Sequence, residues 1–198
     1  MGSKERALFL FDGPNFYKNL MSSALKKGHL DFFRLSSNLA MDREVVAVKF
    51  FTSPVDQNTD ADNYKKQQIF FANLTSSGVD LCSGHLVKRN IKCNKCKASP
   101  VVCKDCGEQL VIKTEKSLDV QIAMASVLGA VQDEYDCLYL ASCDSDLVPA
   151  VKFVREQGKK VFLLLPDGAK GYAVGEVCSG TIPITQEKIN AAQVIFLT

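Results

Sequence analysis

The sequence has no apolar run long enough to cross a membrane or to form the core of an export signal. Its N-terminal run, Ala7 to Phe11, ends at Asp12, whereas a spanning helix needs roughly 20 apolar residues. Arg6 stands where a myristoylation signal carries Ser or Thr. We therefore expect no membrane attachment and a cytoplasmic location.

The signatures of several enzyme classes are also missing. Neither of the two histidines has a well-supported Ser-His-acid or Cys-His pairing, which argues against nucleophilic hydrolase chemistry. No Gly-rich phosphate loop ends in Gly-Lys-Ser/Thr. Asp12-Gly13-Pro14 lacks the second aspartate expected of a haloacid dehalogenase-type phosphatase. No repeat or low-complexity linker divides the chain, so we expect one domain spanning residues 1–198.

Apolar runs and helical patterns alternate along the chain. The apolar runs predict buried strands at 7–11, 45–51, 79–87, 137–141 and 160–165, with a final edge strand at 194–197. Helical spacing occurs at 14–26, 31–41, 60–77, 117–131, 147–157 and 185–192. This alternation predicts an α/β fold with a mainly parallel central sheet covered on both faces. Residues 166–185 give no clear signal.

Four aspartates stand near strand ends in this scheme. Asp12 closes the first strand, Asp144 and Asp146 follow the strand 137–141, and Asp119 lies in the first turn of the helix 117–131. Ligands bind beyond the carboxyl ends of the strands in open parallel sheets. If the first and fourth strands are neighbours, the four carboxylates should face one cleft.

Clustered carboxylates repel one another unless a cation neutralises them. Oxygen-only ligands favour Mg²⁺ or Mn²⁺ over zinc, and such ions can activate water and polarise a phosphodiester. The alternative for Asp12 or Asp119 alone is a turn or helix-cap role. Asp144-Ser145-Asp146 could likewise serve only as a helix N-cap.

Several short motifs, in this order, resemble the NYN domain, the branch of the PIN-like nuclease superfamily that includes bacterial LabA-like proteins. The resemblance runs over roughly residues 7–165. The motifs that carry it are Leu10-Phe11-Asp12-Gly13-Pro14-Asn15-Phe16, Glu115-Lys116-Ser117-Leu118-Asp119-Val120, Ala141-Ser142-Cys143-Asp144-Ser145-Asp146-Leu147-Val148-Pro149-Ala150 and Gly158-Lys159-Lys160-Val161.

The resemblance implies a PIN-like three-layer α/β sandwich and a Mg²⁺- or Mn²⁺-dependent ribonuclease, in our reading an endoribonuclease. It implies that the catalytic, metal-binding residues are Asp12, Asp119, Asp144 and Asp146.

The resemblance also implies supporting roles for three further residues. Asn15 would hold a metal-bound water or a phosphate oxygen. Lys116 and Ser142 match recurrent positions, with Lys116 a phosphate contact, although a solvated lysine and a capping hydroxyl are the alternatives. Cys143 departs from the pattern, which usually has Gly there.

Four of the eight cysteines form two Cys-x-x-Cys pairs, Cys93/Cys96 and Cys103/Cys106. Four thiolates at this spacing predict a closed tetrahedral zinc site, with disulfides or an iron–sulfur cluster as alternatives. A closed site has no open position for substrate, so this zinc would be structural. We read residues 90–112 as a small, zinc-ribbon-like insertion within the domain.

The insertion is basic although the whole chain carries a formal charge of only +2. Residues 88–116 contain eight basic and three acidic residues, a formal +5, and about +3 once four thiolates bind zinc. Projecting beside the acidic cleft, it could hold single-stranded RNA. Only the resemblance favours RNA over DNA. A homodimerisation arm, a protein-docking surface and an inactive RNA- or protein-binding regulator stay open as alternatives.

Overall fold

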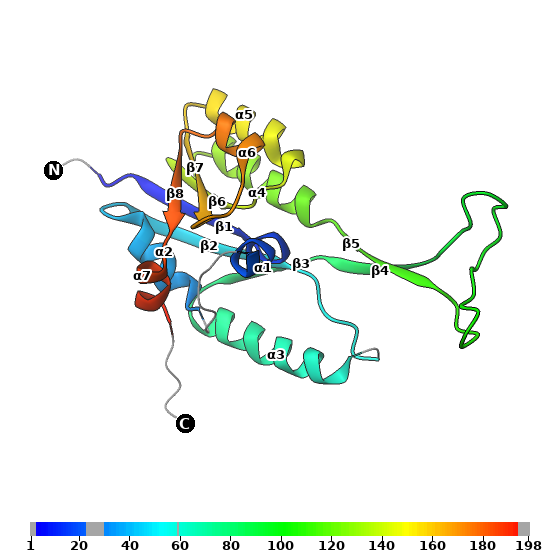
Figure 1. Ribbon diagram of the computed structural model, residues 1–198. Helices are drawn as coiled ribbons and strands as arrows, with labels where there is room; N and C mark the ends of the chain where they lie inside the picture. Colours follow the sequence, from blue (N-terminus) through cyan, green and yellow to red (C-terminus); the bar gives the residue numbers. More distant parts are fainter. Residues whose placement is uncertain (1–2, 23–29, 59, 194–198) are drawn as a thin grey trace.

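A six-stranded sheet forms the centre of the protein, and its neighbouring strands run parallel (Figure 1). The computed structural model describes residues 3–22, 30–58 and 60–193. The strand order is β3-β2-β1-β6-β7-β8, which makes the first strand and the strand at 137–141 neighbours, as the site prediction required. The strands are β1 (Arg6–Asp12), β2 (Glu44–Thr52), β3 (Asp80–Ser83), β6 (Cys137–Ala141), β7 (Lys160–Pro166) and β8 (Gly180–Ile184).

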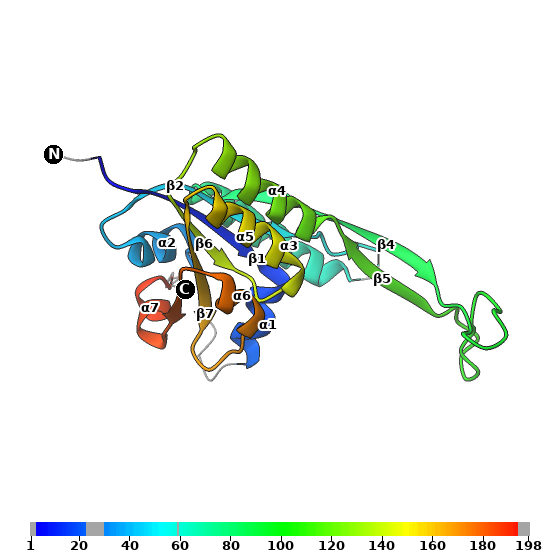
Figure 2. The same cartoon turned by 90° about the horizontal axis from the view of Figure 1, so that it is seen from above.

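Helices cover both faces of this sheet (Figures 1 and 2). One face carries α4 (Leu118–Val131), α5 (Val148–Glu156) and α6 (Tyr172–Val177), and the other carries α1 (Gly13–Ser22), α2 (Phe32–Ala40), α3 (Ala61–Ser76) and α7 (Gln186–Ala191). The α/β fold with a mainly parallel, covered sheet is thereby confirmed. No helix in the described ranges is long and apolar enough to span a membrane.

The central strand β1 is buried on both faces because its apolar run is uninterrupted. Ala7, Phe9 and Phe11 enter the core under α1 and α2, while Leu8 and Leu10 enter the core under α4 and α5. The strand therefore carries Asp12 directly from the buried interior to the carboxyl edge of the sheet.

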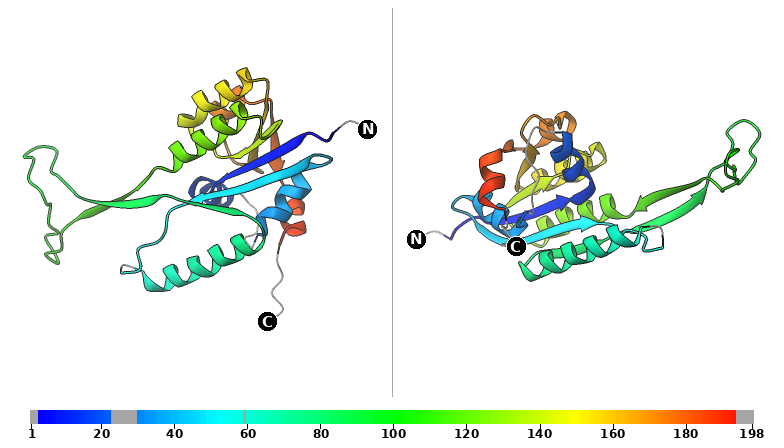
Figure 3. Two further views of the ribbon diagram at one scale, coloured as in Figure 1. Left: turned by 180° about the vertical axis from the view of Figure 1, so that it is seen from behind. Right: turned by 60° about the horizontal axis from the view of Figure 1, so that its bottom comes forward.

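A two-stranded arm projects from this body (Figures 1 and 3). It consists of β4 (His85–Asn90) paired antiparallel with β5 (Val111–Lys116). The single strand predicted at 79–87 is wrong, because the chain leaves the sheet at Gly84. A Cβ there would lie 2.8 Å from the carbonyl oxygen of Lys116 and 2.7 Å from Ser53 Oγ. Only glycine fits this close crossing.

The C-terminal part of the fold was only partly anticipated. The helix expected at 185–192 is present as α7, whereas α6 and β8 occupy the segment that gave no sequence signal. The edge strand expected at 194–197 lies outside the described residues.

Candidate active site

Asp12 lies at the carboxyl edge of the sheet and is buried. Its Oδ2 accepts a hydrogen bond of 2.6 Å from Ser142 Oγ, and its Oδ1 accepts one of 3.2 Å from the backbone N–H of Asn15. Burial raises the pKa of Asp12, both hydrogen bonds lower it, and the negative charges of Asp119 and Asp144 raise it. These three carboxylates therefore lie close enough to act on one another.

The turn after β6 brings two more acids to this edge. It leads into the short 3-10 helix η1 (Ser145–Leu147), which Asp144 caps by accepting the backbone N–H of Asp146 at 2.9 Å. Ser142 Oγ accepts the backbone N–H of Asp144 at 3.3 Å. One hydroxyl thus links the turn to Asp12, and the capping role considered for Asp144 coexists with its place in the acidic group.

Asp119 lies on the first turn of α4, facing the same edge. Burial raises its pKa, and the negative charges of Asp144 and Asp146 raise it further. Ser117 occupies the N-cap position, but its backbone is left-handed at φ 78° and its side chain makes no capping hydrogen bond. Its hydroxyl instead accepts a hydrogen bond of 3.1 Å from Gln121 Nε2.

Glu115, at the root of the arm, is a fifth carboxylate in this group, and we had not predicted it. Burial raises its pKa, the nearby Ser53 hydroxyl lowers it, and the charges of Asp12 and Asp119 raise it. Its position four residues before Asp119, across a strand-to-helix junction, was the available signal. Lys116 follows it, exposed and paired across the arm with His85.

The donor set fits a hard divalent cation, since every acid at this edge offers carboxylate oxygens. Within residues 3–22, 30–58 and 60–193, no three Asp, Glu, His or Cys side chains converge tightly enough to form a ready coordination shell. The acids therefore share an edge and an electrostatic field, and a bound ion would draw their oxygens together while offsetting their repulsion.

Asn15 stabilises the turn that holds the acids. Its Oδ1 accepts hydrogen bonds from the backbone N–H of Cys143, at 2.9 Å, and from Asn19 Nδ2, at 2.8 Å. Cys143 has no positive φ, so its backbone does not require glycine. A Cβ on Gly171 would lie 2.9 Å from Cys143 Sγ. The turn accommodates the thiol because Gly171 leaves room for it.

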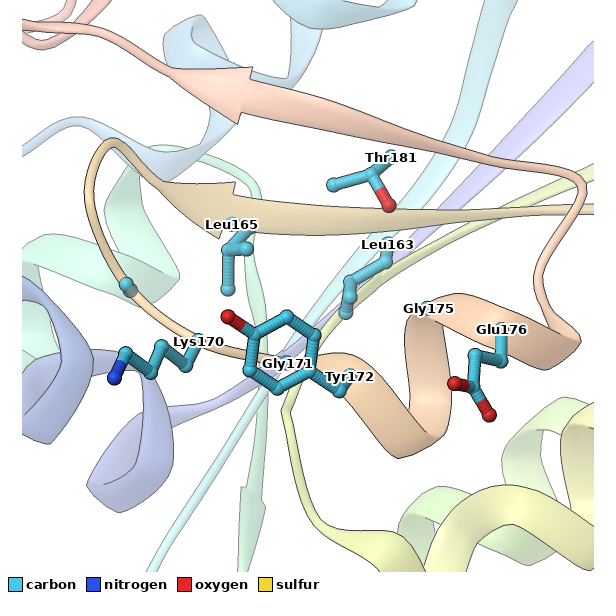
Figure 4. Close-up of a pocket in the computed structure, with 9 residues that line it drawn as sticks. Leu163, Leu165, Lys170, Gly171, Tyr172, Gly175, Glu176 and Thr181 are labelled. Atoms are coloured by element: carbon cyan, nitrogen blue, oxygen red, sulfur yellow. The ribbon is translucent and has the colours of Figure 1, made fainter.

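A pocket of about 380 Å³ adjoins this turn, between the sheet and α6 (Figure 4). Leu163 and Leu165 provide apolar lining, and Lys170 and Tyr172 stand at its border. The Tyr172 side chain is largely exposed, and Gly171 between these two residues touches Cys143. The segment that carries this aromatic ring and this ammonium group therefore packs against the turn that precedes Asp144.

The predicted zinc ligands lie in the loop at the end of the arm, away from the acids (Figure 3). The backbone N–H of Cys96 is the main cause of a lowered pKa at Cys93, and the backbone N–H of Cys106 does the same for Cys103. Each pair thus folds into a turn with its two thiols adjacent. The two pairs do not converge into one four-thiol group in the described structure.

The two turns share further geometry. Lys97 and Gly107, each directly after the second cysteine of its pair, have φ of 60° and 76°. Their N–H groups bond back to the carbonyl oxygens of Cys93, at 2.9 Å, and Cys103, at 3.0 Å. Two matching turns that present thiols and backbone N–H groups together are suited to hold a metal through sulfur.

A parallel α/β sheet with carboxylates beyond its central strands is the arrangement of the PIN-like nuclease superfamily. Within it, the model of the NYN domain matches residues 6–185, so this chain belongs to the NYN domain family. No curated protein matches the chain.

The fold is also similar to a solved structure, a protein of unknown function, VPA0982, from Vibrio parahaemolyticus RIMD 2210633. The TM-score is 0.61 at 19% identity, over 93% of this chain and 96% of that one. At this identity, the likeness supports the fold alone.

Proposed function

We propose that this chain is a metal-dependent nuclease that cuts RNA phosphodiester bonds, acting as an endoribonuclease in the cytoplasm. The observation that carries the proposal is the shared field at one edge of the sheet, where neighbouring aspartates contribute to the raised pKa values of Asp12 and Asp119. Such repulsion costs stability, and a divalent cation would offset it. Membership of the PIN-like nuclease superfamily points to the same chemistry.

In this proposal Asp12, Asp119, Asp144 and Asp146 are the catalytic residues and hold Mg²⁺ or Mn²⁺. The bound ion supplies polarisation of the phosphodiester and acidification of water. Ser142 orients Asp12 through its 2.6 Å hydrogen bond.

Two further residues would contact the substrate. Asn15 would use its Nδ2 on a phosphate, because its Oδ1 already accepts two hydrogen bonds. Lys116, at the root of the arm, would contact phosphate with its ammonium group.

The surroundings of the acids suit a single-stranded nucleic acid. The exposed ring of Tyr172 offers a stacking surface for a base, and Lys170 beside it offers a charge for phosphate. The basic arm extends from the same edge and provides further phosphate contacts along its length. RNA is our proposed substrate, and a DNA strand is the competitor to test beside it.

We propose further that residues 1–198 act as one domain in which 90–112 is a zinc-stabilised insertion. Cys93, Cys96, Cys103 and Cys106 would hold one structural Zn²⁺ after the two turns move together. Since thiolates bind metal in place of protons, the lowered pKa values of Cys93 and Cys103 favour binding.

The zinc proposal predicts one zinc per purified chain and its loss in Cys96→Ser. The arm should then lose protection from proteolysis, because metal-binding free energy stabilises a small module of this kind. Cys82→Ser, in β3 outside the arm, is the matched control and should retain the metal. A wild-type chain without zinc, or Cys96→Ser with full zinc, would contradict the proposal.

The nuclease proposal is tested by cleavage of labelled single-stranded RNA and a matched DNA strand with Mn²⁺, Mg²⁺ or EDTA. Internal cuts in RNA should need the metal and disappear in Asp146→Asn, while Asp42→Asn, an exposed aspartate between α2 and β2, should cut like wild type. RNA bound but uncut with either ion would instead favour the regulator on the same fold.

A further inference from the structure

The outer face of α4 is apolar. Val120, Met124, Leu128 and Val131 expose 65%, 48%, 45% and 59% of their surface. The only charged residue in the helix is Asp119, which faces the acidic edge. Surface helices of soluble proteins normally turn charged or polar side chains outward. This face therefore has the composition of a covered surface.

The arm also exposes apolar side chains to solvent. Of the 14 exposed large apolar side chains in the described ranges, eight lie between residues 102 and 131, on the arm loop, β5 and α4. Val111 and Ile112 are among them, on a hairpin that projects from the body (Figure 3). An isolated two-stranded hairpin is marginally stable in water. The concentration of exposed apolar groups on α4 and the arm marks these two elements as an interaction surface.

We propose that this surface pairs with a second copy of the chain, with the two α4 helices antiparallel about a two-fold axis. The exposed apolar positions 120, 124, 128 and 131 lie three or four residues apart, which places them along one seam of a helix. The outer pair, 120 and 131, and the inner pair, 124 and 128, share almost the same midpoint. An end-for-end rotation therefore sets Val120 against the partner's Val131 and Met124 against the partner's Leu128, as an isologous contact requires.

Charge at the two ends of the seam fits the same register. Lys116 lies just before α4 and Glu134 just after it, and within the described residues neither takes part in an ion pair. The antiparallel arrangement that matches the apolar positions also sets Lys116 beside the partner's Glu134. A parallel pairing would instead set Lys116 beside the partner's Lys116 and Glu134 beside the partner's Glu134, so this pair of charges favours the antiparallel form.

The arm also gains a partner in this arrangement. β5 runs into the N-terminus of α4 through Ser117 alone, so each arm extends past the C-terminal end of the partner's α4. Its exposed apolar residues are then directed along the second copy rather than into water. The acids stay outside the seam, apart from Asp119 at its end. Asp119 and Lys116 are therefore shared between the seam and the proposed active site, so the proposal is tested by molar mass rather than by cleavage.

The test is the molar mass of the full chain in solution, measured by sedimentation equilibrium over a range of micromolar concentrations. We expect wild type at twice the chain mass of 21.7 kDa, and Met124→Lys/Leu128→Lys at the mass of one chain with unchanged circular dichroism. Both changes place helix-forming residues on an exposed surface, so the monomer fold should tolerate them. Ile69→Lys, an equally apolar exposed site on α3, should remain a dimer.

Charge reversal tests the register itself. Lys116→Glu and Glu134→Lys should each weaken the dimer, by about fivefold in dissociation constant, and the double reversal should restore it. A monomeric wild type, or a dimer unaffected by the Met124/Leu128 changes, would overturn the proposed surface. A dimer that the double reversal fails to restore would overturn the antiparallel register.

Discussion

The two ends of the central sheet treat their carboxylates in opposite ways. At the amino end, Asp136 accepts hydrogen bonds from the backbone N–H, the Nε and the Nη2 of Arg6, at 2.7, 3.1 and 2.9 Å. These contacts lower the pKa of Asp136 to about 2. At the carboxyl end, burial raises the pKa values of Asp12 and Asp119. The negative charges of nearby aspartates raise them further.

The same contrast extends to the rest of each cluster. Glu5, at the amino end, is paired with Arg43 and Lys160, and its pKa is lowered. Glu115, at the carboxyl end, has a raised pKa. The protein thus stabilises its fold with compensated charges where the strands begin. It accepts repulsion where the strands end, and acids held at a cost to the fold point to a functional role.

The largest test of this contrast is Asp119→Asn. Cleavage should fall by about a thousandfold, because a group that stabilises the reacting charges is lost. The metal-free variant should nevertheless melt about 2 °C higher than wild type, since a repelled carboxylate is removed. Mn²⁺ should raise the melting temperature of wild type more than that of the variant. A lower melting temperature for the metal-free variant would contradict the idea of stored repulsion.

The pH dependence of that effect has a definite sign. The folded pKa of Asp119 is raised above the unfolded value, so ionisation of Asp119 opposes folding. Its destabilising effect is absent below the unfolded pKa and complete above the folded one. Thermal melts in EDTA should therefore separate Asp119→Asn from wild type near neutral pH and bring the two together in acid.

A smaller effect is expected from Asp136→Asn. The variant should lose about 1 kcal/mol of unfolding free energy near neutral pH, because the pair with Arg6 is partly solvent-screened. Cleavage should be unchanged. Since the folded pKa is lowered to about 2 from 3.8, the stabilisation is present above pH 4 and is lost as the pH falls through 2. Urea titrations at pH 7 and at acid pH measure the loss of unfolding free energy and its dependence on pH. Equal unfolding free energies for the variant and wild type at pH 7 would contradict the pairing.

Much of the fold could be predicted because long patterns determine it. The uninterrupted apolar run before Asp12 identified the central strand, and regular alternation identified the parallel sheet. β8 was missed because Gly180 and Pro183 resemble a loop, although an edge strand tolerates both. The break after β3 was missed because close packing around Gly84, a tertiary property, forces the chain out of the sheet.

The residues of the candidate site could be predicted where they belong to sequence motifs. They could not be predicted where only the three-dimensional fold brings them close. Asp12 and Asp144 follow the ends of β1 and β6. These strands are neighbours in the sheet, as the prediction that the two aspartates would lie close together required. Glu115 was not predicted as a site residue because it lies on β5 of the arm, and the direction of β5 depends on its pairing with β4. The room for Cys143 depends on Gly171, far away in the sequence.

The two edges of the described sheet bear on how the protein behaves at high concentration. Pro183 removes a backbone donor from β8, and β3 at the other edge is only four residues long before Gly84 turns the chain away. An exposed strand with a full row of donors and acceptors recruits other chains into aggregates. Because both edges are shortened or interrupted in this way, the six-stranded sheet resists growth by strand addition.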